Sequence, residues 1–136
     1  ISYIHPGDRV GVLLELNCET DFVARNEDFK KLAHNLALQV AGMHPLYIAP
    51  EDVPADVLEK EREVYLTQLQ DKSKNIAEKA IQGKLDDFYA SVCLIKQPFV
   101  LNQELTVENV IAETLVILKE NIKIARFVRF EVGDRS

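Results

Sequence analysis

The sequence has few of the residues on which metal, redox and nucleotide chemistry usually depend. Its 136 residues include two cysteines, five glycines, three histidines and no tryptophan. Cys18 and Cys93 are too few for a disulfide scaffold and lack the paired spacing of a zinc site. We expect free thiols, with a disulfide between the two as the disfavoured alternative. Because the glycines form neither a phosphate-binding loop nor a dinucleotide fingerprint, the sequence predicts no bound nucleotide and no cofactor.

Recognisable catalytic sets are also missing. None of the three histidines stands in a familiar arrangement with a cysteine, serine or aspartate, so we expect no catalytic residue. Asp21, Glu27 and Asp28 are the most conceivable metal ligands, but their spacing lacks the ligand series and the glycine of a calcium loop. The sequence therefore predicts no metal site, and a protein that acts by binding rather than as an enzyme.

Positive charge is scarce as well. Sixteen basic residues stand against 22 acidic ones, a formal charge of −6, so the chain has no bulk attraction for nucleic acid. No apolar run reaches the roughly 18 residues of a membrane-spanning helix, and the start does not resemble a secretory signal, so we expect a soluble intracellular protein without a membrane partner. With 47% hydrophobic residues the chain can bury a core, and we expect one domain over residues 1–136.

Two strongly patterned segments flank a short connector near the N-terminus. Residues 10–18 alternate between apolar and other positions, which predicts a half-buried strand. Residues 26–42 repeat apolar side chains at spacings of three and four, which predicts a helix that Asn26 caps and Gly42 ends. Residues 19–25 between them carry an acid beside an aromatic, and we expect this connector to be displayed by its two neighbours.

The rest of the chain divides into shorter elements. We expect an edge strand over 46–49, helices over 54–69, 73–82, 84–92 and 106–118, and a final strand over 122–132. Such an order predicts an α+β fold, with helices packed on one face of a small three-stranded antiparallel sheet. Leu13 and Phe127 would then lie on the other face, which a second copy of the chain could cover.

The connector and several other stretches resemble the elongation factor Ts family, whose members release GDP from elongation factor Tu in bacterial and organellar translation. The agreement is with residues 14–18, 20–26, 76–79 followed by Gly83, 97–100 and 126–133, and it covers nearly the whole chain. The resemblance implies the core or dimerisation domain of that family in its short, single-subdomain form. The family's small N-terminal helical domain has no counterpart in these residues.

The resemblance also implies a function for the connector. In the family, the aspartate and phenylalanine that match Asp21 and Phe22 project from the core and push into the partner GTPase near its magnesium site. From the pattern alone Phe22 is better explained as a core residue, because an aromatic at a strand-to-helix junction usually packs into the core; the resemblance reverses this expectation. Thr20, Val23, Ala24, Arg25 and Asn26 are expected to support the turn.

Two further contact residues follow from the family. His5 resembles a histidine that contacts the GTPase in long forms, although a lone histidine in a turn is usually a surface residue. In a homodimer one protomer could supply Asp21 and Phe22 while the other supplies His5. Leu118 matches an apolar contact position of the family, with a core role as the equally open alternative.

The sequence therefore predicts a guanine-nucleotide exchange factor that binds elongation factor Tu, GDP-bound or nucleotide-free, in a bacterial cytoplasm or a plastid stroma. A different class of function stays open, a structural dimerisation or ribosome-associated module of a larger polyprotein with little exchange activity. A metal-dependent hydrolase built on His5 and Asp21 is the third alternative.

Overall fold

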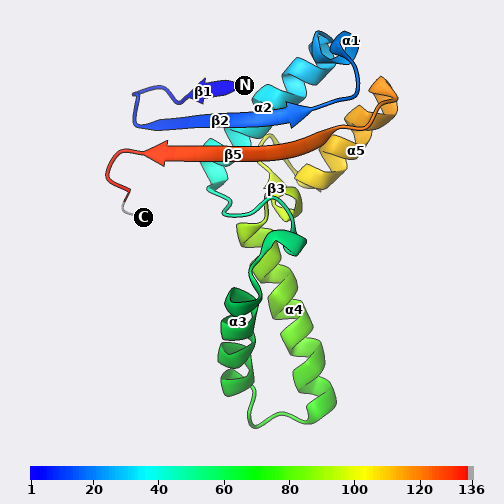
Figure 1. The fold of residues 1–136 in the computed structure, drawn as a ribbon. Coiled ribbons are helices and arrows are strands. Elements are labelled where there is room, and N and C mark those ends of the chain that lie inside the picture. The colour runs from blue at the N-terminus through cyan, green and yellow to red at the C-terminus, as the bar shows by residue number, and fades with distance from the viewer. Residues whose placement is uncertain (135–136) are drawn as a thin grey trace.

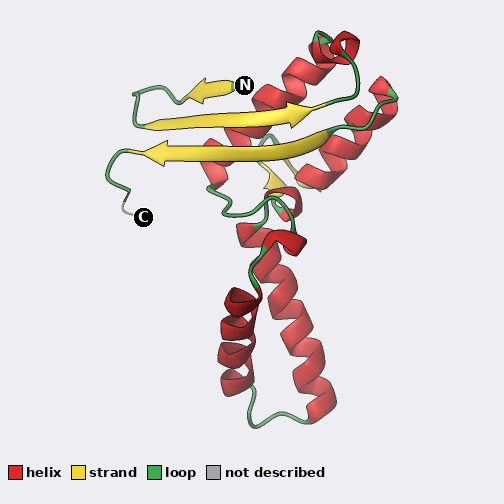
Figure 2. Ribbon diagram, viewed as in Figure 1, coloured by secondary structure: helices red, strands yellow, loops and turns green. Residues whose placement is uncertain are grey.

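A three-stranded antiparallel sheet and a helical hairpin that points away from it give the molecule its shape (Figure 1). The computed structural model describes residues 1–134. The elements are β1 (Ser2–Ile4), β2 (Val10–Asn17), α1 (Asp21–Ala24), α2 (Glu27–Met43), α3 (Ala55–Gln68), α4 (Lys74–Val92), β3 (Pro98–Phe99), β4 (Asn102–Thr106), α5 (Val107–Leu118) and β5 (Lys123–Glu131), with short 3-10 helices at Pro50–Asp52 and Leu94–Lys96. Figure 2 shows the sheet of β1, β2 and β5 in front of helices α2 and α5, in agreement with the predicted α+β class, while β3 and β4 form a separate two-stranded sheet.

The sheet has the order β1-β2-β5, with β2 in the centre and both pairings antiparallel. The prediction of a three-stranded antiparallel sheet is confirmed, but its third strand is β1 and not residues 46–49. In that segment Leu46 and Tyr47 donate their backbone N–H groups to Val92 at the end of α4, and Leu94 donates to Tyr47. Tyr47 makes a single bridge to Cys93. The predicted edge strand is wrong because its backbone bonds run to a helix end, where no strand lies beside it.

A β-bulge at Ala125 interrupts the pairing of β2 with β5. Leu16 lies opposite Ile124, whereas Glu15 lies opposite Arg126, so Ala125 has no partner on β2. One extra residue on one strand reverses the direction of every side chain that follows it. The alternation predicted for residues 122–132 therefore changes face in the middle of β5.

The bulge decides which aromatic side chain faces the core. Phe127 packs against the buried cluster, so the prediction that it lies on the outer face of the sheet is wrong. Val128 and Phe130 take the outer face instead, and Phe130 is 76% exposed. Leu13, directly opposite Val128, is 59% exposed, as expected. The outer face is thus more apolar than the sequence alone predicts.

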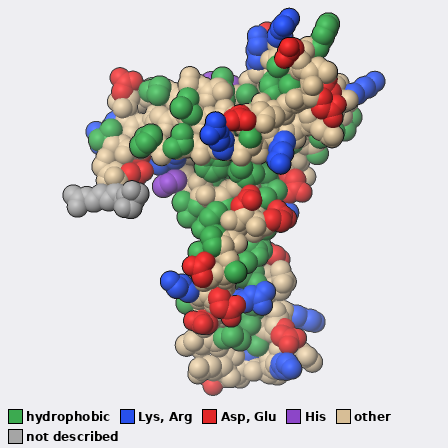
Figure 3. All heavy atoms as spheres, in the orientation of Figure 1, with side chains coloured by type: hydrophobic (Ala, Val, Ile, Leu, Met, Phe, Trp, Pro, Cys, Tyr) green, Lys and Arg blue, Asp and Glu red, His purple; other side chains and the backbone are tan. Residues whose placement is uncertain are grey.

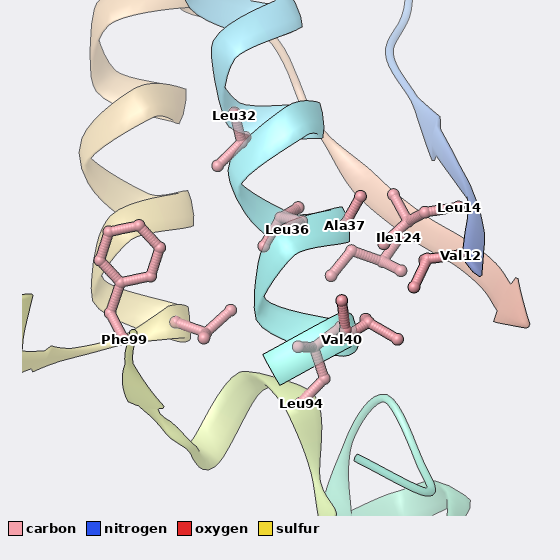
Figure 4. Close-up of a cluster of buried hydrophobic side chains, with 11 residues drawn as sticks. Val12, Leu14, Leu32, Leu36, Ala37, Val40, Leu94, Phe99 and Ile124 are labelled. Carbon is pink, nitrogen blue, oxygen red and sulfur yellow. The ribbon is translucent and has the colours of Figure 1, made fainter. Parts of the chain in front are cut away.

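The core lies between the sheet and the helices α2 and α5 (Figure 4). Helix α2 starts at the predicted cap, where Asn26 Oδ1 accepts the N–H of Asp28 at 2.7 Å. It continues past Gly42 and ends at Met43, because His44 adopts the left-handed conformation that terminates the helix. Helix α5 starts at Thr106, as predicted, in a reciprocal cap with Asn109.

The hairpin of α3 and α4 does not cover the sheet (Figure 1). Residues 73–82 and 84–92, predicted as two helices, form the single helix α4, capped by Ser73. The prediction that Gly83 stops a helix is wrong, because Gly83 has no left-handed φ and the helix passes through it. Within residues 1–134 no helix is both long and apolar enough to cross a membrane.

Candidate partner-binding site

The connector forms a one-turn helix, α1, at the tip of the sheet-and-helix body (Figure 1). Thr20 caps it, since its Oγ1 accepts the N–H of Val23 at 3.3 Å. Phe22 is 90% exposed, the most exposed large apolar side chain among residues 1–134, so it does not belong to the core. Asp21, its neighbour, is also exposed. An acid and an aromatic thus stand together in solvent on a short turn between β2 and α2.

The residues around this pair hold the turn through their backbone. The N–H of Arg25 donates to the carbonyl of Asp21 at 3.2 Å, and the N–H of Asn26 donates to Val23 at 2.9 Å. Asn26 at the same time caps α2. Val23 is half-buried, whereas Ala24 is exposed. Closed at both ends by helix caps, the turn is a local structure and not a loose loop.

Glu120 is the residue of this region that the sequence interpretation missed. Its Oε1 accepts the backbone N–H groups of Glu19 at 3.0 Å and Thr20 at 3.1 Å, and its Oε2 accepts the Thr20 hydroxyl at 2.6 Å. The residues are 100 positions apart in the chain, so no local pattern could have paired them. The only available signal was a carboxylate in the turn after α5.

His5 lies at the other end of the sheet. It belongs to the turn between β1 and β2, where its Nδ1 is 3.0 Å from the hydroxyl oxygen of Tyr3. The eight residues of β2 separate it from the connector, a length of about 26 Å at the usual rise of a strand. One protomer therefore does not bring His5 to Asp21, which rules out the hydrolase built on these two residues of a single chain.

Leu118 is the last residue of α5 and is half-buried, so both interpretations of it remain open. Its neighbours Val116 and Ile117 are 72% and 63% exposed. A shallow hollow of about 370 Å³ lies between this helix end and the connector, lined among others by Glu19, Val116 and Glu120. The end of α5 and the start of the connector therefore line one hollow.

The outer face of the sheet is the second exposed apolar surface. Ile4, Leu13, Val128 and Phe130 lie on it, and hydrophobic side chains gather over the strands in the space-filling view (Figure 3). At its border Arg126 Nε contacts Glu15 Oε1 at 3.0 Å. An exposed apolar sheet face of this kind is a candidate contact surface.

The structure also places the candidate metal ligands and the two cysteines. Among residues 1–134 no three histidine, cysteine or acidic side chains lie together as metal ligands. Cys18 and Cys93 are both free, so the disulfide alternative is wrong for this structure. Burial, and then the carboxylates of Asp52 and Glu51, raise the pKa of the Cys93 thiol to about 11.

Comparison with known proteins identifies the family of the chain. The family model described as Elongation factor TS matches residues 1–134. Proteins named Elongation factor Ts are 50% identical over 134 residues in Thermotoga petrophila and 53% identical over 135 residues in Pseudothermotoga lettingae. Each match covers 98% of this chain, and 67% and 68% of the respective relative. The chain belongs to the elongation factor Ts family.

Proposed function

We propose that the chain is a guanine-nucleotide exchange factor of translation elongation that binds elongation factor Tu and promotes release of its GDP. Family membership supports the exchange-factor role. The observation that carries the mechanism is Phe22, 90% exposed beside Asp21 on a turn anchored at both ends. The chain acts by binding, and residues 1–136 serve as one core domain.

The two side chains act together as a wedge. Burying the Phe22 ring in a pocket of the partner is worth about 1.5 to 3 kcal/mol, which makes it a fitting anchor of the interface. Asp21 brings a negative charge close to the phosphate groups, which it repels, and to the magnesium ion, which it attracts away from its ligands in the GTPase. Displacing the bound cation then loosens GDP.

Exchange requires that the factor prefers one state of its partner. It accelerates release only if it binds the nucleotide-free GTPase more tightly than the closed GDP-bound form. By linkage, GDP must weaken the binding of the factor by the same ratio. A wedge satisfies this condition if the pocket that receives Phe22 opens only while the magnesium site is disturbed.

The apolar outer face of the sheet supports a homodimer. Two such faces can pack around a two-fold axis that lies between the sheets and is perpendicular to the strands. In that arrangement β2 of one protomer runs antiparallel to β2 of the other. The His5 turn of one protomer then lies at the same end as α1 of its partner. Such a dimer has two composite contact surfaces, each with Asp21 and Phe22 from one chain and His5 from the other.

Complementation between variants tests the composite surface. A mixture of chains with Phe22→Ala and chains with His5→Ala contains heterodimers in which one surface is intact. We expect this mixture to exchange GDP faster than either variant alone after subunits have been allowed to exchange. A mixture no more active than the average of the two contradicts the composite surface, and activity of the Phe22→Ala chains alone would contradict the wedge.

Binding measurements on the two states of elongation factor Tu test the function itself. We expect tight binding to the nucleotide-free protein and progressive loss of the complex as GDP is added with magnesium. Equal binding to both states would contradict an exchange role and would favour the structural dimerisation or ribosome-associated module. The bacterial relatives favour a bacterial cytoplasm over a plastid as the place of action.

A further inference from the structure

We infer that Glu120 is a positioning residue for exchange, which holds the α1 turn in its binding conformation through Thr20. The effect of Glu120 on exchange rests on the proposed function, whereas its effect on the order of the α1 turn does not. Glu120 does not need to touch the partner. Its carboxylate ties the turn that carries Asp21 and Phe22 to the junction between α5 and β5.

One carboxylate accepts three hydrogen bonds from the connector. Two come from successive backbone N–H groups, those of Glu19 and Thr20, and the third comes from the Thr20 hydroxyl at 2.6 Å. Bonds to an ionised acceptor are shorter and stronger than those between neutral groups. No other side chain among residues 1–134 makes more than one hydrogen bond to residues 19–25.

Thr20 passes this restraint on to the wedge. The Thr20 hydroxyl donates to Glu120 and its Oγ1 accepts the N–H of Val23, so the same group is bonded to Glu120 and caps α1. The hydroxyl can do both only in one orientation of the Thr20 side chain. Fixing that orientation fixes the start of α1, and with it the directions of Asp21 and Phe22, which follow immediately in the chain.

Glu120 is itself held by the fold. Lys119 ends α5 in the left-handed conformation, with φ of 58°, and donates its N–H to Leu115 at 2.8 Å. β5 begins a few residues later at Lys123, within the pairing to β2. The carboxylate therefore stands between a capped helix and a paired strand, which makes it a firm support for an exposed turn.

Such a support matters because the other hydrogen bonds of the turn are made within residues 18–26 and do not tie it to the rest of the fold. α1 contains no buried residue, and Phe22 has no packing partner that could fix it. Without the carboxylate, the turn would have to be ordered when the partner binds, and that ordering would oppose the complex. An exchange factor with a preordered wedge avoids this cost.

The structural half of the inference is tested by NMR on the free chain. We expect backbone order parameters of residues 21–24 near the value of about 0.85 typical of rigid backbone, and a fall towards about 0.6 in Glu120→Ala. Glu120→Gln can still accept both N–H groups and donate to Thr20, and should restore most of the order. Glu113→Ala, an exposed acid on α5, is the matched control and should change nothing.

The functional half is tested with elongation factor Tu loaded with a fluorescent GDP analogue. At factor concentrations well below saturation, we expect Glu120→Ala to lower the release rate about tenfold, because about 1.4 kcal/mol of lost preorganisation weakens the complex about tenfold. Glu120→Gln should recover most of the rate. The melting temperatures of Glu120→Ala, Glu120→Gln and the control Glu113→Ala should stay close to that of the wild type.

The outcomes separate the two claims. Unchanged order in residues 21–24 of Glu120→Ala overturns the inference, whatever the exchange rates are. Increased disorder with an unchanged release rate also overturns it, since the support would then have no consequence for exchange. If the wild-type chain itself fails to accelerate release, the proposed function fails, and the order parameters still decide whether Glu120 holds the turn.

Discussion

Gln39 of α2 donates an amide hydrogen to Gln97, with 3.2 Å between Nε2 and Oε1, and both side chains are fully buried. Gln39 also accepts the N–H of Val100 at 2.7 Å and donates to the carbonyl of Pro98. Gln97 donates to the carbonyls of Ser91 and Met43. The two amides thus join α2, the end of α4 and the segment that leads into β3 and β4.

Removing one of these amides should destabilise the fold more than its size suggests. Gln97→Ala removes the partner of one amide hydrogen of Gln39 and of two backbone carbonyls, and each buried group left unsatisfied costs about 1 to 3 kcal/mol. We expect the free energy of unfolding in urea to fall by at least that amount. Gln103→Ala, an exposed glutamine on β4, is the control and should change it little. Equal effects of the two substitutions would contradict the role of the pair.

The elements with a long regular pattern could be predicted from the sequence. Residues 10–18, 26–42 and 106–118 each repeat at one period over their whole length, and the two helical segments also carry their own caps, so local physics decides all three. The bulge at Ala125 leaves only a weak trace in the sequence, where Arg126 interrupts the alternation, and a single charged residue on an apolar face is also compatible with a regular strand. The edge strand over 46–49 failed because tertiary contacts supplied its backbone with other partners.

Some residues of the candidate site could also be predicted from the sequence, and others could not. Asp21 and Phe22 stand in one local stretch, so the sequence could point to them. Glu120 acts on that stretch from 100 positions away, and only the fold shows the contact. His5 precedes β2 and α1 follows it, so the predicted strand already separates the two in one chain. Which residues of a second chain lie near His5 depends on how two sheets pack, and a prediction of strands does not show that.

The outer face of the sheet should hold two chains together. Phe130 is 76% exposed and does not belong to the core, so Phe130→Asp should leave the fold intact and place a charge in the contact. We expect sedimentation velocity to show a dimer for the wild type and a monomer for this variant.

A matched control is Val116→Asp, a charge at an apolar residue of similar exposure on α5, which should remain dimeric. A monomeric wild-type chain at tens of micromolar would contradict the dimer, and so would dissociation by both variants alike.

Gly83→Ala should stabilise the protein. Gly83 lies inside α4 without a left-handed φ, and an added Cβ would meet no atom within 4 Å. Alanine is favoured over glycine in a helix interior by up to about 1 kcal/mol. Thermal unfolding should show a higher midpoint, whereas Gly7→Ala, at a φ of 101°, should lower it. A lower midpoint for Gly83→Ala would show that the helix needs a break at this position.

The thiol of Cys93 should be unreactive in the folded protein. It is buried, and its pKa is raised from the usual 9.0 to about 11, so little thiolate is present at pH 8. We expect a thiol reagent to label only Cys18, which is half-buried, until the chain is denatured. Two fast-reacting thiols in the native protein would contradict the buried position of Cys93.

The same raised pKa gives the stability a dependence on alkaline pH. The folded chain holds this proton more tightly than the unfolded chain, so the contribution is complete below about pH 9 and is lost as the pH rises towards about 11. Urea unfolding should show this loss, and Cys93→Ala should reduce it. An unchanged pH profile in Cys93→Ala would assign the loss to other groups.

The most direct test of the wedge is the release rate of a fluorescent GDP analogue from elongation factor Tu. The wild-type chain should accelerate release, and a chain carrying Asp21→Ala and Phe22→Ala should lose that acceleration while its circular dichroism and melting temperature stay unchanged. Leu66→Ala, an exposed apolar residue on α3, should behave like the wild type. Acceleration that survives in the double variant would contradict the wedge.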